Sequence, residues 1–239
     1  MKTENHTKLE QFWAHELGME SDLPKAPRLY CTVQHLYSGL QLFRKGDLVV
    51  VAVPLAKAEF VQDAIAGLSP NELFSVECLK HIFARDAERI LGPAELNYAD
   101  EISFRSGRHD SARELSGSDS VGYHALIAAL DSKEVEDSGV SAEVYPAFGA
   151  FSDKTLCAVA SYAVWERSIA HISVATHPNY RRRGFAKAAV RSLALNAFDG
   201  GLILQWRALA WNENSLTLAR DLGFEYYCST IYVRLRESQ

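Results

Sequence analysis

Residues 172–191 read ISVATHPNYRRRGFAKAAVR, and this stretch decides the fold. It begins as an apolar strand, passes through Pro178 and a basic loop, and continues with the composition of a helix. The first turn of a helix carries unpaired backbone N–H groups and a partial positive charge, so it binds phosphate groups. Gly184 lacks a Cβ that would keep a phosphate away, and the arginines at 181–183 add cationic donors. The stretch therefore predicts a site for a ligand that carries a diphosphate or polyphosphate.

Several loop types can be compared with this stretch. A P-loop needs a Gly-x-x-x-x-Gly-Lys-Ser/Thr run, which the sequence lacks, and the dinucleotide fingerprint needs three glycines where only Gly184 fits. A run of arginines alone also fits a solvated basic turn or a nucleic-acid contact. The pattern Arg-x-x-Gly-x-Ala at 181–186, with Pro-Asn-Tyr and an apolar strand before it, resembles motif A of the GNAT N-acetyltransferase family. That family holds the pyrophosphate of acetyl-CoA in this loop.

A second stretch supports the resemblance. Residues 203–224 read ILQWRALAWNENSLTLARDLGF. In the GNAT family a strand leads to an Asn, then to a helix, and Leu-Gly-Phe closes the block. The matching positions here are a strand at 202–209, Asn212, a helix at 215–222 and Leu-Gly-Phe at 222–224. Both stretches occur in the order of the family.

Local signals agree with the helix in the second stretch. Asn214 and Ser215 offer an N-cap, and Gly223 offers a C-cap. The resemblance covers roughly residues 110–235 and implies the GNAT order of strands and helices.

The predicted fold class is α/β with a mixed sheet. The resemblance implies a GNAT acyl-CoA transferase fold in the C-terminal half, at 110–239, preceded by a smaller α/β subdomain at 1–105. The stretch 105–120, RSGRHDSARELSGSDS, is polar and rich in Ser and Gly, which is typical of a linker. Residues 91–100, LGPAELNYAD, resemble a Gly-Pro…Tyr-Ala stretch of two-part GNAT proteins. The N-terminal subdomain is expected either to help form the acceptor site or to stabilise or dimerise the protein.

Hydrophobic periodicity and turn signals place the individual elements. In the C-terminal half we expect strands at 112–115, 147–151, 156–165, 169–176, 202–209 and 226–235, helices at 121–130, 185–197 and 215–222, and a polar loop at 131–146. In the N-terminal part we expect strands at 29–33, 40–43 and 48–53, and helices at 9–17, 56–66 and 70–83. Ser69 and Glu72 predict a capping box at the start of the last helix.

The composition favours a cytoplasmic enzyme. The 239 residues are 48% hydrophobic, without an apolar run of membrane-spanning length and without a signal-peptide core at the start, so no membrane partner is expected. The net charge of −5 argues against a nucleic-acid partner, although residues 181–239 hold nine Lys and Arg against five Asp and Glu. Four scattered cysteines predict reduced thiols, and the histidines show no metal-ligand spacing.

The resemblance implies acetyl-CoA as co-substrate and a primary amine as acceptor. In the family the backbone of the strand before motif A binds the pantetheine arm, the loop N–H groups hold the pyrophosphate, and the Asn of the second stretch contacts the cofactor. Carried over, the predicted cofactor-binding residues are Val174, Ala175, Thr176, Arg181, Arg182, Arg183, Gly184, Phe185, Ala186, Lys187 and Asn212. The acceptor amine would attack the acyl carbonyl directly, so the protein must position the reactants and move protons.

The sequence departs from the family at two frequent catalytic positions. Ala219 stands where a Tyr often acts as general acid, and Arg207 stands where a Glu often acts as general base. Neither residue can transfer a proton as needed. His171, in the strand before motif A, is the candidate base, with a structural strand histidine as the alternative. These departures keep open a second function, a catalytically weak or inactive acyl-CoA-binding or regulatory protein on the same fold.

Overall fold

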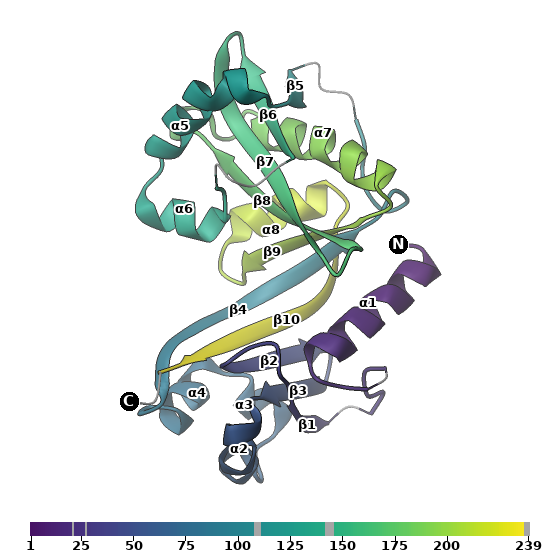
Figure 1. The fold of residues 1–239 in the computed structure, drawn as a ribbon, viewed down its shortest axis with the longest axis vertical. Helices are drawn as coiled ribbons and strands as arrows, with labels where there is room; N and C mark the ends of the chain where they lie inside the picture. Colours follow the sequence, from purple (N-terminus) through teal and green to yellow (C-terminus); the bar gives the residue numbers. More distant parts are fainter. Residues whose placement is uncertain (21, 27, 108–110, 142–145, 237–239) are drawn as a thin grey trace. The chain divides into compact units, whose positions relative to one another are not determined.

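The computed structural model describes residues 1–236 except 21, 27, 108–110 and 142–145. The chain forms two compact units, which we describe separately (Figure 1). Unit 1 comprises Met1, Tyr98–Trp206 and Thr217–Glu225, and unit 2 comprises Lys2–Asn97, Arg207–Leu216 and Tyr226–Gln239. The division differs from the expected boundary at 105–110, because a loop and the last strand of the chain belong to the same unit as the N-terminal part.

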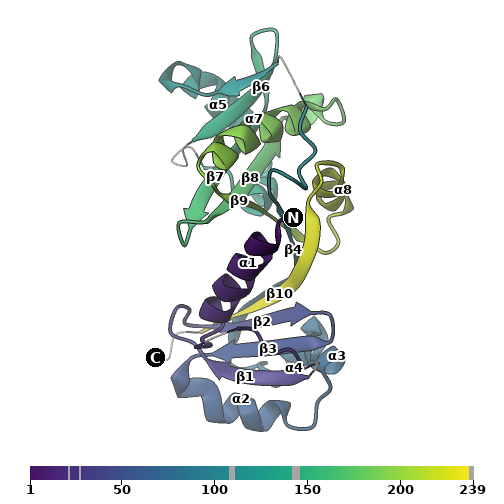
Figure 2. The ribbon, with the colours of Figure 1, turned by 90° about the vertical axis from the view of Figure 1, so that its right-hand side faces the viewer.

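Unit 2 is built on a sheet with the strand order β1-β3-β2-β10-β4. Figure 2 shows β2, β3 and β1 side by side. The strands β1 and β3 pair in parallel, whereas β2 pairs antiparallel with both β3 and β10. The bounds of the strands are β1 Leu29–Val33, β2 Leu40–Lys45, β3 Leu48–Val53, β4 Ala87–Ala99 and β10 Glu225–Leu235.

Helices cover both faces of this sheet. One face contributes Leu42, Val51 and Ile231 to a buried cluster with Leu79 and Phe83. The bounds of the helices are α1 Thr3–Glu16, α2 Ala58–Ile65, α3 Pro70–Leu73 and α4 Val76–Ile82, with a 3₁₀ turn η1 at Leu55–Lys57.

The opposite face of the same sheet packs against α1. Trp13 of this helix lies with its ring centroid 5.0 Å from that of Phe43. Successive residues of a strand point to opposite faces, so Leu42 packs in the cluster with Leu79 and Phe83, whereas Phe43 packs against α1. Such two-sided burial explains why all six residues of β3 are buried.

The expected helix at 70–83 is two helices. Ser75 interrupts the pattern and caps α4, since its Oγ accepts the backbone N–H of Cys78 at 3.4 Å. The predicted capping box of α3 is confirmed: Ser69 Oγ accepts the N–H of Glu72 at 3.3 Å, and the Glu72 carboxylate accepts the N–H of Ser69 at 2.8 Å.

We expect Ser69→Ala to lower the free energy of unfolding by about 1 kcal/mol, because the N-cap acceptor is lost. Hydrogen bonds from the Ser69 side chain and backbone lower the pKa of Glu72. The stabilisation by the ionised Glu72 carboxylate is therefore fully present at a pH above the ordinary pKa range of Glu. It is lost as the pH falls through the lowered pKa of Glu72. Urea unfolding measures the change, and Ser69→Asn, which can still cap, should retain most of the stability. Equal midpoints for wild type and Ser69→Ala would contradict the assignment.

In unit 1 the strands follow one another in the order β9-β8-β7-β6-β5. The strands β5 to β8 pair antiparallel in sequence order, and β8 and β9 pair in parallel. Its elements are β5 Ala112–Glu114, α5 Ser120–Ala128, α6 Ser132–Ser138, β6 Ala147–Ser152, β7 Thr155–Trp165, β8 Ile169–Thr176, α7 Phe185–Asp199, β9 Ile203–Leu209 and α8 Glu213–Asp221, with 3₁₀ turns η2 Gly117–Asp119 and η3 Pro178–Tyr180. The expected mixed α/β class is confirmed, and the order of elements is as expected except for the additional helix α6.

Helices lie on both faces of the unit 1 strands as well. The hydroxyl of Tyr162 in β7 donates to Asn196 Oδ1 of α7 at 2.7 Å. On the other face, Leu126 of α5 clusters with Val159 and Ala175. Helix α6 lies where the sequence predicts a loop, because the capping box of Asp131 and Glu134 starts a short helix without a buried residue.

Two observations on the described residues bear on partners. None of their helices is long and apolar enough to cross a membrane. They also contain no group of three or more His, Cys, Asp or Glu side chains that could hold a metal ion.

Candidate functional site

Strands β8 and β9 separate soon after they meet. They pair only at Ile169↔Ile203, Ala170↔Leu204 and His171↔Gln205. Beyond this point β8 runs on to Thr176, still paired with β7 on its other side. The edge of β8 that faces away from β7 therefore has no β9 partner over 172–176, where Val174, Ala175 and Thr176 were predicted. An extended ligand can bind such an edge as an added strand does.

The loop after β8 presents its backbone to open space. Gly184 is the N-cap of α7 and has φ +85°, and a Cβ built on it would meet no atom within 4 Å. The N–H of Ala188 bonds to the Gly184 carbonyl at 3.0 Å, so the N–H groups of Phe185, Ala186 and Lys187 are the free first-turn donors of the helix. This cradle fits a diphosphate, because a side chain at Gly184 would fill it.

Three cationic side chains of the loop, those of Arg181, Arg183 and Lys187, already have partners. Arg181 lies 2.6 Å from a Glu134 carboxylate oxygen, and Lys187 lies 2.6 Å from Asp221. The hydrogen bond from Lys187 lowers the pKa of Asp221. The Arg183 guanidinium lies 5.2 and 5.5 Å from the ring centroids of the neighbouring Tyr and Phe. A phosphate would thus meet backbone donors first, and Arg181 and Lys187 would have to exchange partners to reach it.

Asn212 has a structural task of its own. Its Oδ1 accepts the backbone N–H of Ser215 at 3.1 Å, and its carbonyl accepts that of Leu216 at 3.1 Å. Asn212 is therefore the N-cap of α8, and the expectation that Asn214 and Ser215 supply this cap was wrong. Contacts place Asn212 in unit 2, whereas 174–187 lie in unit 1.

The C-cap of α8 is confirmed. Gly223 has φ +89°, and the N–H of Phe224 bonds to the carbonyl of Ala219 at 3.1 Å. The N–H of Gly223 bonds to the carbonyl of Arg220 at 3.1 Å, which completes a Schellman motif. A Cβ at Gly223 would clash with the carbonyl oxygen of Ser103.

His171 lies at the last paired position before β8 and β9 separate. Its Nδ1 is 2.6 Å from Gln205 Oε1, and its ring stacks on Trp165 with centroids 4.2 Å apart and planes at 12°. Gln205 Nε2 in turn donates to the Tyr98 hydroxyl at 2.6 Å. Sequence reasoning missed Gln205, Tyr98 and Trp165. A signal was present, because Gln205 is a lone polar residue in an otherwise apolar strand start, ILQW at 203–206.

The two usual catalytic positions offer no proton-transfer group. Ala219 is fully buried, so a tyrosine restored there would not fit without repacking. The Arg207 guanidinium, in unit 2, lies 5.7 Å from the Tyr232 ring. Burial raises the pKa of Tyr232, and its hydroxyl accepts a hydrogen bond from Gln41 Nε2 at 2.9 Å.

Residues 147–232 match the family model described as GNAT acetyltransferase. Residues 147–232 belong to the GNAT acetyltransferase family. The GNAT domain lies in the C-terminal half, as expected, and it contains the separating strands and the Gly184 loop. A search of curated proteins found no match.

A comparison with solved structures found proteins that are similar to this chain. A GNAT-family protein from Novosphingobium aromaticivorans is 23% identical, with TM-score 0.50, over 64% of this chain and 67% of that chain. A GCN5-related N-acetyltransferase from Kribbella flavida is 14% identical, with TM-score 0.49, over 67% of this chain and 64% of that chain. The ribosomal-protein-S18-alanine N-acetyltransferase from Escherichia coli is 17% identical, with TM-score 0.37, over 54% of this chain and 95% of that chain. At this identity the first likeness concerns the fold alone.

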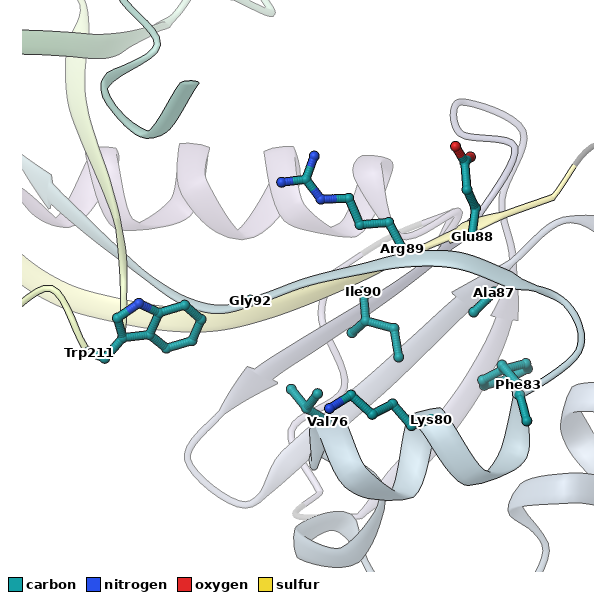
Figure 3. A pocket seen from close by; sticks show the side chains of 10 residues that line it. Val76, Lys80, Phe83, Ala87, Glu88, Arg89, Ile90, Gly92 and Trp211 are labelled. Atoms are coloured by element: carbon teal, nitrogen blue, oxygen red, sulfur yellow. The ribbon is translucent and has the colours of Figure 1, made fainter. Parts of the chain in front are cut away.

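Unit 2 contains a groove that is distinct from the GNAT motif residues. The groove, of about 540 Å³, lies between β4 and α4. Figure 3 shows Val76 and Lys80 on the side of α4 that faces Ile90, with Trp211 at one end. No predicted site residue lines it, although Trp211 directly precedes Asn212 in the chain.

Proposed function

We propose that this protein is an N-acetyltransferase that transfers the acetyl group of acetyl-CoA to a primary amine by direct attack. The observation that carries the proposal is the separation of β8 from β9 directly before the Gly184 cradle. The first feature suits an extended arm and the second suits a diphosphate, and acetyl-CoA carries both, joined end to end.

The length of the open edge supports this ligand. Five residue steps separate Thr176 from His171, which is roughly 16 Å at about 3.3 Å per residue. A pantetheine arm is of comparable length when extended. With its pyrophosphate at the N–H groups of 182–187 and its arm along 174–176, the acyl end would lie near His171. His171 is then the proposed general base.

In this reaction the protein has to orient the two reactants and accept one proton. The amine nitrogen forms a bond to the acyl carbon, the carbon–sulfur bond breaks, and CoA leaves as the thiolate. His171 accepts the proton that the amine loses, and the thiolate takes up a proton from solvent. Orientation of the two reactants by the strand edge and the loop supplies most of the advantage.

One set of observations favours a second function. Arg207 and Ala219 occupy the frequent base and acid positions, so the protein is alternatively an acyl-CoA-binding or regulatory protein with weak or no turnover. Calorimetric titration with acetyl-CoA, followed by an assay of CoA release with a panel of primary amines, separates the two functions. Binding with turnover supports the transferase, and binding without turnover supports the regulator. Absence of binding would contradict both.

We expect Glu134→Gln to strengthen acetyl-CoA binding by about two- to fivefold, because it frees Arg181 from its partner to meet a phosphate. The gain should fade at high ionic strength, since exposed charges are screened. Titration calorimetry at two salt concentrations measures it. Asp137→Asn removes the same charge from α6 without touching this ion pair and serves as control. An equal gain in both variants would show that only net charge matters.

A further inference from the structure

We infer that Gln205 and Tyr98 are positioning residues, which hold the His171 imidazole in the tautomer protonated at Nδ1, so that the lone pair of the neutral ring is on Nε2. The role in proton transfer rests on the proposed function, whereas the tautomer itself does not. All of the residues involved belong to unit 1.

The three side chains form one continuous chain of hydrogen bonds. His171 Nδ1 lies 2.6 Å from Gln205 Oε1, and Gln205 Nε2 lies 2.6 Å from the Tyr98 hydroxyl oxygen. Gln205 and Tyr98 are both fully buried, while His171 is only partly buried. Buried polar groups need their hydrogen bonds satisfied, so the inner two side chains are held firmly, and the imidazole is the least buried group of this chain of hydrogen bonds.

The orientation of the Gln205 amide selects the tautomer. The hydroxyl of Tyr98 accepts from Nε2 and keeps its own proton to donate elsewhere. The amide oxygen of Gln205 then faces His171, and an oxygen there requires a donor, so Nδ1 carries the proton. Trp165 fixes the plane of the imidazole by stacking on it at 4.2 Å. A neutral imidazole held in this way has its lone pair on Nε2.

A neutral amide suits a base that must be unprotonated near pH 7. A carboxylate at position 205 would favour the imidazolium and raise the pKa of His171. Trp165 from β7 and Gln205 from β9 contact His171 directly, and Tyr98 from β4 is linked to it through Gln205. The nearest charged residues along the β7–β8 hairpin are Glu166 and Arg167 in its turn, and their charges are opposite. Gln205 therefore orients the ring without adding charge.

The test reads the tautomer directly in the intact protein. Long-range ¹H–¹⁵N correlation spectra distinguish a protonated Nδ1 from a protonated Nε2, and His171→Gln assigns the signal. We expect a protonated Nδ1 in the wild type and a shift toward protonated Nε2 in Gln205→Leu. Gln205→Glu should raise the pKa of His171 in an NMR titration. Tyr98→Phe removes only the hydroxyl, so it tests the same chain of bonds if a residue 205 variant fails to fold.

Activity provides the second readout. Gln205→Leu should lower kcat by about tenfold or more with unchanged affinity for acetyl-CoA, and Gln205→Glu should move the rise in rate to higher pH. Gln41→Leu is the matched control, because it also breaks a hydrogen bond from a buried glutamine to a tyrosine hydroxyl, that of Tyr232 in unit 2. The Gln41→Leu variant should have the same His171 tautomer and the same pH dependence of the rate as the wild type.

The outcomes separate this inference from the proposed function. A protonated Nε2 in the wild type, or an unchanged tautomer in both Gln205→Leu and Tyr98→Phe, overturns the inference. A protonated Nδ1 that depends on Gln205, in a protein that acetylates no amine, supports the positioning of the ring and counts against the transferase.

Discussion

Gly184→Val is expected to weaken acetyl-CoA binding by about 100-fold or more, which corresponds to roughly 2.7 kcal/mol or more of binding free energy. Two effects add. The valine side chain enters the open space in which the pyrophosphate is proposed to lie. The φ of +85° is also strained for a β-branched residue, so the loop would shift and misplace the first N–H groups of α7. Titration calorimetry with acetyl-CoA measures the loss.

A second glycine of unit 1 provides the control. Gly201 has φ +69° and also has no atom within 4 Å of a built Cβ, but it follows α7 instead of preceding it. Gly201→Val should therefore carry a similar backbone strain and retain acetyl-CoA binding. Unchanged affinity in a folded Gly184→Val variant would refute the phosphate site, and equal losses in both variants would assign the effect to strain alone.

His171→Gln is expected to lower the maximal rate by about 100-fold or more, the usual scale of general-base catalysis. A base works in its unprotonated form, so the wild-type rate should rise with pH as the imidazole loses its proton. This rise should disappear in the variant. Affinity for acetyl-CoA should be nearly unchanged, because the proposed ligand contacts come from 174–187. Steady-state rates across pH, combined with calorimetry, measure both effects.

His124 serves as the matched control for this substitution. It is exposed on α5 in the same unit, and His124→Gln should leave both the rate and its pH dependence unchanged. If His171→Gln behaves as the control does, His171 is a structural residue. The proton would then have to leave through another group or through water.

The sequence predicts local structure well wherever strong local signals stand close together. The strand at 169–176 and the start of the following helix at 185 are confirmed, because an apolar run, a Pro turn and a glycine follow each other directly. The strands at 29–33 and 48–53 also have the predicted bounds. Motif A also identified the family of the C-terminal half, since the loop pattern and its flanking elements occur together.

Features that depend on distant or competing contacts could not be predicted in this way. Tyr98 and Gln205 are 107 positions apart, so nothing local indicates that their side chains meet. The break between α3 and α4 depends on whether Ser75 caps a helix or continues one, and both are compatible with the local pattern. The cap of α8 was misplaced because Asn212, Asn214 and Ser215 are all good cap residues, and only the backbone path selects among them.

The buried link between Tyr98 and Gln205 also has a consequence for how the strands find their alignment. Side chains alternate between the two faces of a strand, so a slip of one residue in β4 or β9 would turn either side chain to the opposite face. Such a slip costs little where the neighbours are all apolar, but here it would leave an amide and a hydroxyl buried without each other, at a cost of about 1–3 kcal/mol each. The hydrogen-bonded pair of Tyr98 and Gln205 therefore disfavours misaligned pairing of the strands during folding. The other residues at the start of β9, at 203–206, are apolar and carry no such polar signal.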